Sequence, residues 1–372
     1  MKKAIKLNII TLLLLLIASN AYAGERGVFY NTMRDRAMGN VGILSAKGAT
    51  AFINNPALLT RGKVNISPIT FQFFLNKNFI DLGNFINDNA DDFSRFDSLS
   101  PGDADSLYNE LNSIDNRWMK LGIHGSAGIS IKNLGFAVYA TPNFEIKIDK
   151  GIYEPRVFGR GSFDRVVTFG FGKGLDFLVP GLKGGIAVKL ITREEIEEIK
   201  LGFSELGSGG DAVEDIFDSL QVNRNGVSFD IGGIYKMSDG LELGFVLGDA
   251  FGSFDEDTTL SASDSTSSSD FDTNLKIAAR INLPLRIKAE FMVVDLLNRQ
   301  ETNFFNRVHI GAEMDLVILK LRGGFNQGYP TFGVGINLAI IQLDVAVWTD
   351  EIGSVPGLDG ETFFGAQINL GF

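Results

Sequence analysis

The chain has 372 residues, of which 45 are Asp or Glu and 34 are Lys or Arg, so its formal net charge is −11. This acidity argues against a nucleic-acid partner, because a phosphate backbone attracts clustered cations. The chain has no cysteine and only two histidines, His124 and His309, so we expect neither disulfide bonds nor a zinc site.

The N-terminal residues have the pattern of an export signal. Lysines at positions 2, 3 and 6 precede an unbroken apolar run over 12–17, and Ala21-Tyr22-Ala23 then supplies a small-residue cleavage site. The apolar run is too short for a permanent transmembrane helix. We therefore predict a signal peptide over residues 1–23 and export by a bacterial cell.

Residues 24–61 precede the first predicted strand and are too apolar for a solvated linker. We predict a short helical turn with Asn55 as its N-cap and Pro56 at its first position, because these residue types suit a helix start. The segment is expected to lie inside or beneath the sheet that follows, as a hatch. Its motif would be Asn55, Pro56 and Ala57, and its apolar contacts Phe29, Phe52, Leu58 and Leu59.

Residues 62–372 alternate between apolar and polar side chains with a period of two, which is typical of β-strands. For example, Leu319, Leu321 and Phe325 alternate with Lys320 and Arg322. An even number of strands of about ten residues is typical of outer-membrane barrels. We predict about fourteen strands, near 64–75, 119–132, 134–147, 163–173, 184–194, 225–237, 241–250, 271–283, 285–296, 306–316, 318–326, 331–339, 341–349 and 362–372.

The predicted connections alternate between long and short, as expected for a barrel with long outer loops and tight periplasmic turns. The sequence therefore predicts an all-β fold, a transmembrane antiparallel barrel with an N-terminal hatch and short helices in outer loops, in the bacterial outer membrane. Its terminal Phe372 resembles the signal that the outer-membrane assembly machinery reads, so that machinery and membrane lipid are expected partners. The long connections are 76–118, 148–162, 195–224, 251–270, 297–305, 327–330 and 350–361.

Many charged side chains lie at positions that should face the lumen. They could select a solute, or they could pair with one another and with the hatch, and we favour pairing. His124 and His309 are likewise expected to be hydrogen-bonded lumen groups rather than proton switches. The set is Lys132, Lys189, Arg193, Asp230, Lys276, Arg280, Arg286, Lys288, Glu290, Arg307, His309, Glu313, Asp315, Lys320, Arg322 and Asp344.

Two outer loops carry apolar residues at helical spacing. Such helices could form an apolar landing groove for a ligand or fold down as a lid over the barrel mouth, and both readings stay open. The candidate ligand-docking residues are Leu107, Leu111 and Ile114 in the first loop, and Val213, Ile216, Phe217 and Leu220 in the second.

No other site chemistry is expected. A calcium site built from Asp255, Asp257 and Asp264 is conceivable, but the spacing is not that of an EF-hand, and we favour a solvated loop. No Ser/His/Asp arrangement or metal-ligand spacing stands out. We expect no enzyme activity, catalytic residue, cofactor or metal.

The segment RAMGNVGILSAKGATAFINNPALL, residues 36–59, resembles the N-terminal hatch region of the FadL/TodX superfamily of outer-membrane transporters for hydrophobic compounds. The matching motif is Asn55-Pro56-Ala57, and residues 309–348 resemble late strands of the same superfamily. The resemblance implies uptake of a hydrophobic small-molecule ligand, such as a long-chain fatty acid, through a plugged barrel. Ligand would dock on the outer loop helices and then enter a pocket that touches the hatch.

Other branches of this superfamily resemble the chain equally. Leu58 stands where the fatty-acid transporters usually have glycine, and the spelling NNPALL is closer to TraF-like and PorV-type relatives. Those relatives imply a barrel that acts as a scaffold or as a secretion or conjugation partner. A third possibility, an open diffusion porin, predicts steady conductance, which residues 24–61 in the lumen should prevent.

Overall fold

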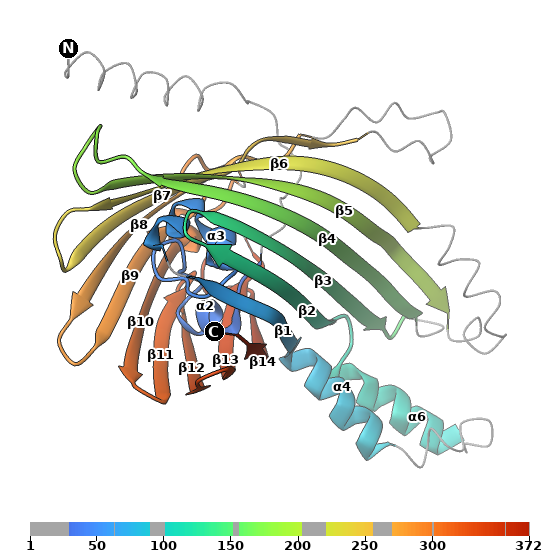
Figure 1. Cartoon of the computed structure of the whole chain (residues 1–372). Coiled ribbons are helices and arrows are strands. Elements are labelled where there is room, and N and C mark those ends of the chain that lie inside the picture. Colours follow the sequence, from blue (N-terminus) through green and yellow to red (C-terminus); the bar gives the residue numbers. More distant parts are fainter. Residues whose placement is uncertain are drawn as a thin grey trace.

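A single closed barrel of fourteen antiparallel strands forms the body of the molecule, as predicted (Figure 1). The computed structural model describes residues 30–62, 64–89, 101–151, 156–202, 221–255, 270–299, 301–353 and 355–371. Each strand pairs with its neighbours in sequence, and β1 closes the barrel on β14. The strands are β1 Asn65–Asn76, β2 Trp118–Ile131, β3 Leu134–Asp149, β4 Arg156–Gly174, β5 Leu182–Gly202, β6 Gln221–Lys236, β7 Leu241–Phe254, β8 Asn274–Leu283, β9 Ile287–Val293, β10 Val308–Leu316, β11 Leu319–Asn326, β12 Tyr329–Leu338, β13 Ile341–Glu351 and β14 Gly360–Leu370.

The strand register separates a polar inner face from an apolar outer face. Between β10 and β11, Glu313 pairs with Arg322 on the inner face, and Met314 pairs with Leu321 on the outer face, because successive side chains point to opposite sides. Apolar side chains are exposed all around the outside, including Phe71, Phe169, Leu190, Phe229, Phe291, Ile310, Phe332, Val345 and Ile368.

The connections divide the barrel into two rims. The tight turns 132–133, 175–181, 237–240, 284–286, 317–318 and 339–340 lie at one end, which we call the short-turn rim. The other end, the long-loop rim, carries the connections 77–117, 150–155, 203–220, 255–273, 294–307, 327–328 and 352–359.

Four expectations about strand boundaries and side-chain positions were wrong. The connection 327–330 is a tight turn, because Gln327 and Gly328 both have left-handed φ, at 53° and 91°, and β12 starts at the next residue. Strands β3 to β5 run further toward the long-loop rim than predicted, because backbone pairing continues beyond the apolar band. Lys132 and Arg286 lie in turns of the short-turn rim, with φ of 53° and 58°, and not on the inner face.

Helices occur inside the barrel and in its connections. Helices α2 Met33–Ala37, α3 Ala51–Asn54 and η1 Pro56–Arg61 belong to the hatch, and η4 Phe304–Arg307 precedes β10. The connection 77–117 holds α4 Lys77–Asp88, α6 Pro101–Glu110 and η3 Leu111–Ser113. Helix α4 was not predicted. It starts directly at the end of β1, where Asn76 accepts a hydrogen bond of 3.0 Å from the Phe79 N–H. Among the described residues, no helix is long and apolar enough to cross a membrane.

The main hydrophobic core lies where the hatch meets the inner wall. Met38, Leu44 and Leu58 of the hatch pack in one buried cluster with Ile234 of β6 and Val246 of β7. Figure 1 shows the hatch helices enclosed by strands from both sides of the barrel. The barrel is therefore filled by its own N-terminal segment, and this position defines the candidate site.

Candidate functional site

The hatch, residues 30–62 of the described chain, sits against an inner wall lined with glycines. A Cβ atom added at Gly170 of β4 would lie 2.6 Å from Cδ2 of Phe52 and 2.9 Å from Cδ1 of Leu59. At Gly244 of β7 it would lie 2.6 Å from Cδ2 of Leu44. Such close approach is possible only without a side chain, so the wall is shaped to the hatch. Gly135, Gly172, Gly185, Gly232, Gly311, Gly324, Gly333 and Gly365 make similar contacts with it.

The motif Asn55-Pro56-Ala57 anchors one side of the hatch. Asn55 Oδ1 accepts a hydrogen bond of 3.0 Å from the Ala57 N–H, and Asn55 Nδ2 donates one of 2.9 Å to the Ile43 carbonyl. Asn55 is thus the N-cap of η1, with Pro56 in its first turn. The side chain joins two parts of the hatch and faces Gly232 of β6.

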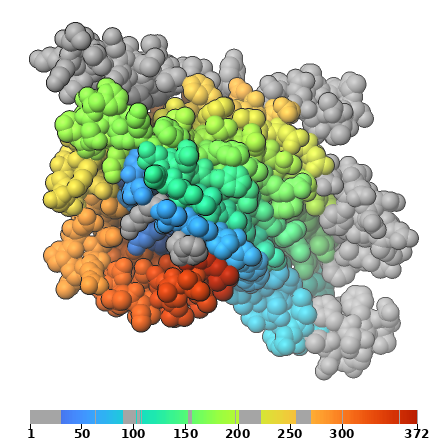
Figure 2. Space-filling view, in the orientation of Figure 1, coloured from blue at the N-terminus to red at the C-terminus, as the bar shows by residue number. Residues whose placement is uncertain are grey.

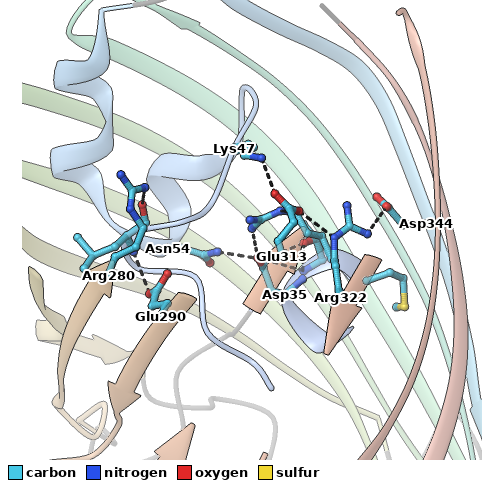
Figure 3. Close-up of polar contacts among 12 residues, drawn as sticks. Asp35, Lys47, Asn54, Arg280, Glu290, Glu313, Arg322 and Asp344 are labelled. Carbon is cyan, nitrogen blue, oxygen red and sulfur yellow. Dashed lines mark hydrogen bonds and ion pairs between the residues drawn. The ribbon is translucent and has the colours of Figure 1, made fainter. Parts of the chain in front are cut away.

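The opposite side of the hatch is held by a buried ionic cluster centred on Glu313 of β10. Its carboxylate accepts hydrogen bonds from Arg34 Nε at 2.8 Å, Lys47 Nζ at 2.6 Å and Arg322 Nε at 2.9 Å. Arg322 also donates to Asp344 at 2.6 Å. Figure 3 shows Lys47 of the hatch and Glu313, Arg322 and Asp344 of the barrel wall converging. These lumen charges pair with one another and with the hatch, which is the reading favoured from the sequence.

Backbone groups of the hatch are bound by side chains of the barrel wall and by Arg61 of the hatch itself. The Leu44 carbonyl accepts from Arg61 Nη2 at 2.6 Å and Arg280 Nη1 at 2.7 Å, and the Leu44 N–H donates to Glu290 at 3.1 Å. His309 Nδ1 lies 2.9 Å from the Gly39 carbonyl oxygen. These bonds satisfy polar backbone atoms that would otherwise be buried without partners.

The two histidines are both hydrogen-bonded lumen groups. His309 contacts the hatch backbone at Gly39. His124 of β2 instead has a partner on the neighbouring strand β3, because its Nε2 lies 3.0 Å from Asn143 Oδ1. Phe74 meets the His124 ring edge to face, with the ring centroids 4.9 Å apart. The packing is that of a buried structural group.

Aromatic side chains fill the lumen on the long-loop side of the hatch. Trp348 is fully buried and stacks on Phe363, with the ring centroids 5.4 Å apart. The Arg36 guanidinium of the hatch lies 4.6 Å from the centre of the Trp348 ring and 4.9 Å from that of Phe74. Cation–π contacts of this kind hold the hatch to β1 and β13.

Two pockets that share the lining residues Lys47 and Gly48 lie at the other face of the hatch, and together they are called the two-part cavity. Its larger part has a volume of about 310 Å³ and is mostly apolar, and it includes Asn65 and Ser130, close to the short-turn rim. A polar part of about 50 Å³ adjoins it and shares Lys47 and Gly48. Figure 2 shows hatch residues, in blue, in the hollow between the green and the red strands. The larger part is lined by Ala46, Lys47, Gly48, Ala49, Ala51, Phe52, Leu58, Leu59, Arg61, Gly62, Asn65 and Ser130.

The polar part of the cavity has an excess of positive charge. Arg34, Lys47, Lys320 and Arg322 line it, against the carboxylates of Glu313 and Asp344. Within the described part of the chain, Arg34 Nη2 is buried without a hydrogen-bond partner. Burial, together with the nearby Arg34 charge, lowers the pKa of Lys47 to about 8. The arrangement can accept an anionic headgroup near Lys47 and an apolar tail in the larger part.

The structure separates the remaining predicted residues into four groups. Phe52, Leu58 and Leu59 are buried in the hatch, whereas Leu111 and Ile114 are buried with Phe85 of α4 and Met119 of β2. Leu111 and Ile114 therefore form the interior of the helix pair and are not an exposed docking surface. For Leu107 only its place in α6 is described. Phe29, Val213, Ile216, Phe217 and Leu220 lie outside the described residues, as do residues 1–23, Asp257, Asp264 and Phe372.

Sequence reasoning missed the basic residues of the hatch. Arg34, Lys47 and Arg61 lie in a segment that was read for its apolar residues, and their partners are far away in the chain. Arg34 and Glu313 are separated by 279 positions. The available signal was the presence of several basic side chains in a segment expected inside a barrel, where each needs a partner.

Comparisons with known proteins give structural neighbours alone. No family model matches the chain, and no curated protein matches it. The Pseudomonas putida toluene transporter TodX is similar in structure, with 11% sequence identity and a TM-score of 0.48, over 93% of this chain and 98% of that one. An outer membrane phospholipase from Salmonella typhi has 9% identity and a TM-score of 0.32, over 88% and 98% of the two chains. Values this low carry no argument about function, and the description of the barrel rests on its strand pairing.

Proposed function

We propose that the protein carries hydrophobic small molecules, such as long-chain fatty acids, across the bacterial outer membrane. The observation that carries this proposal is the two-part cavity, in which an apolar space of about 310 Å³ meets a cationic polar space at Lys47. Small-molecule sites are typically mostly apolar spaces of this size with a few polar groups that orient the ligand. The chemistry fits an amphipathic acid.

The barrel exterior supports a membrane location. Its exposed apolar side chains would face lipid, as in outer-membrane barrels, where an apolar band about 25 Å high surrounds a polar interior. The short-turn rim would then face the periplasm, and the cavity would lie at the periplasmic face of the hatch. Outer-membrane lipid and, during biogenesis, the assembly machinery are the proposed partners.

Passage of a ligand through the barrel requires part of the hatch to move while the rest keeps its contacts with the barrel wall. The apolar side, with Phe52 and Leu59 against glycines, is tightly packed. Lys47 is the more exposed member of the ionic cluster, with 39% of its side chain accessible, whereas Glu313 is 1% exposed. We propose that the segment around Lys47 moves first, because its ion pair is the one that solvent or a ligand can reach.

A binding measurement tests the proposal. Purified protein in amphipol is titrated with a radiolabelled long-chain fatty acid, and we expect saturable binding. Lys47→Gln should weaken it about tenfold, because a hydrogen bond to a charged group contributes about 1.5 kcal/mol or more. Lys77→Gln is the matched control, since Lys77 is exposed on α4 and pairs with Asp81 at 2.6 Å. Absence of saturable binding to the unaltered protein would overturn the proposal.

A second candidate function is a scaffold or a secretion or conjugation partner that transports nothing. The glycine-lined inner wall favours this function, because a hatch that packs this closely against the wall is suited to staying in place. Chemical cross-linking in native membranes separates the two functions. A stoichiometric protein partner together with no fatty-acid binding would support the scaffold.

A further inference from the structure

Three neighbouring turns of the short-turn rim expose aliphatic side chains at their tips. Leu285 in turn 284–286 is 78% exposed, Val317 in turn 317–318 is 66% exposed, and Ile340 in turn 339–340 is 60% exposed. These turns join β8 to β9, β10 to β11 and β12 to β13, so they follow one another around the rim. Together they form an apolar arc, which we call the apolar rim, with Leu283, Leu316, Ile318 and Leu338 beside the tips.

The backbone of these turns makes the choice of residues unusual. Leu285 has φ of 60°, Val317 of 75° and Ala339 of 62°. The left-handed region favours Gly or Asn, and it is especially unfavourable for a β-branched residue such as valine. In water, Gly or Asn would relieve both the backbone strain and the exposure of apolar surface. The aliphatic side chains therefore point to an apolar environment outside the chain.

The height of the adjoining strands also indicates an apolar environment around these turns. Strand β11 has eight residues and β9 has seven. With a rise of about 3.3 Å per residue and a tilt of about 40°, eight residues span about 20 Å of barrel height. An outer-membrane barrel has an apolar band about 25 Å high. The outward column of Leu321 and Leu319 therefore needs Val317 to complete the band.

Another turn on the same rim provides an internal contrast. Turn 237–240 joins β6 and β7, which have 16 and 14 residues, so these strands are long enough without their turn. Asp239 in this turn has a fully exposed side chain and pairs with Lys236 at 2.6 Å. Aliphatic tips thus accompany the short strands β9 and β11, and Ile340 extends the arc beside β12 and β13, which have 10 and 11 residues. Turn 175–181 also exposes Phe177 and Leu178, and turn 237–240 exposes Met237.

We propose that the apolar rim, turns 284–286, 317–318 and 339–340, is inserted among the acyl chains of the inner leaflet. The occupant of this surface is lipid, because the arc continues the outward apolar columns of β8 to β13. Arg286, the one charged residue in the three turns, is exposed beside Leu285, and its long side chain lets the guanidinium reach the headgroup layer while its methylene groups stay among apolar neighbours. The β8–β13 side of the barrel consequently sits deeper in the bilayer than the β6–β7 side, where Asp239 reaches water.

Site-directed spin labelling tests this proposal, and the absence of cysteine from the chain makes single labels straightforward. Val317→Cys and Ile340→Cys report on the apolar rim, and Asp239→Cys is the matched control on the same rim. In liposomes, labels at 317 and 340 should collide more with oxygen than with a water-soluble nickel chelate, and the label at 239 should do the reverse. Leu285→Cys gives a third reporter if either rim variant does not fold.

Two results would overturn the proposal. Nickel collision at 317 and 340 as frequent as at 239 would place the rim in water. Labels at 317 and 340 that neither oxygen nor nickel reaches in native outer-membrane vesicles, but that oxygen reaches in liposomes, would mean that a protein covers the rim in the cell. Neither result depends on whether the protein binds a fatty acid.

Discussion

At the scale of single residues, Glu313 and Lys47 connect the stability of the hatch with its proposed chemistry. Glu313 is almost completely buried and receives three basic groups, two of which belong to the hatch. Lys47 is the member of this cluster that also lines both parts of the cavity. One carboxylate therefore holds the hatch, and one ammonium stands between that carboxylate and the proposed ligand.

Removing the Glu313 charge should destabilise the folded protein. Glu313→Gln leaves Arg34, Lys47 and Arg322 without their shared anion, and breaking a buried ion pair in this way costs about 3–5 kcal/mol. Urea unfolding in liposomes measures this change in the free energy of unfolding. Asp239→Asn, which breaks an exposed pair, is the control and should leave the unfolding midpoint unchanged. Equal midpoints for both variants would show that the Glu313 cluster does not hold the hatch.

The pKa of Lys47 predicts a pH dependence of ligand binding. Burial lowers this pKa to about 8, so the ammonium loses its charge as the pH rises through about 8. Affinity for a carboxylate ligand should fall over this range, and Lys47→Gln should remove that fall. The free energy of unfolding should change with pH in the opposite direction to the affinity, because charged Lys47 is disfavoured in the folded protein relative to the unfolded chain. That penalty is complete below about pH 8 and fades as the pH rises toward the ordinary lysine pKa. Fatty-acid titrations from pH 6 to pH 9.5 check the binding prediction.

At the scale of elements, the hatch and the strands were not equally predictable. Period-two alternation predicted the strands because pairing places successive side chains on opposite faces, and Asn55-Pro56 predicted the start of η1 because capping is local. Helix α4 was not predicted, because its N-cap, Asn76, is also the last residue of β1. The Glu313 cluster was not predicted, because its members come from segments that are far apart in the sequence. The contacts of Gly170 and Gly244 with the hatch were not predicted, because the presence of a glycine in a strand does not indicate which residue packs against it.

Close packing of the hatch against the glycine-lined inner wall predicts that alanine substitutions at two glycines of β4 differ in their effect on stability. Gly170→Ala places a methyl group within 2.6 Å of Phe52, and overpacking of this kind costs about 1–3 kcal/mol. Gly159→Ala, also in β4, meets nothing within 4 Å and should be nearly neutral. Thermal unfolding of the two variants compares their stability. If Gly170→Ala is as stable as Gly159→Ala, the hatch is not packed against β4 as described.

At the scale of the whole molecule, the barrel is a closed wall filled from within. Hatch residues contact β4, β5 and β6 through η1, and β11 to β14 through α2. The described lumen is therefore occupied on both sides by the N-terminal segment, and an open aqueous pore is not expected.

Electrical measurements test this occupancy. In planar bilayers, the unaltered protein should show no steady conductance, whereas deletion of residues 30–61 should give steady channels, because among the described residues it is the hatch that fills the lumen at that level. Circular dichroism establishes that the deletion variant keeps its β-structure. Steady conductance by the unaltered protein would contradict the occupied lumen.

Photo-cross-linking tests whether an amphipathic ligand occupies the cavity at the hatch. A long-chain fatty acid with a diazirine on its tail is bound to the purified protein and activated by light, and the modified peptides are identified by mass spectrometry. We expect adducts within residues 46–52 and 58–59, and their loss when unlabelled fatty acid competes. Adducts confined to outward-facing strand residues such as Phe332 and Val345, unaffected by competition, would contradict it.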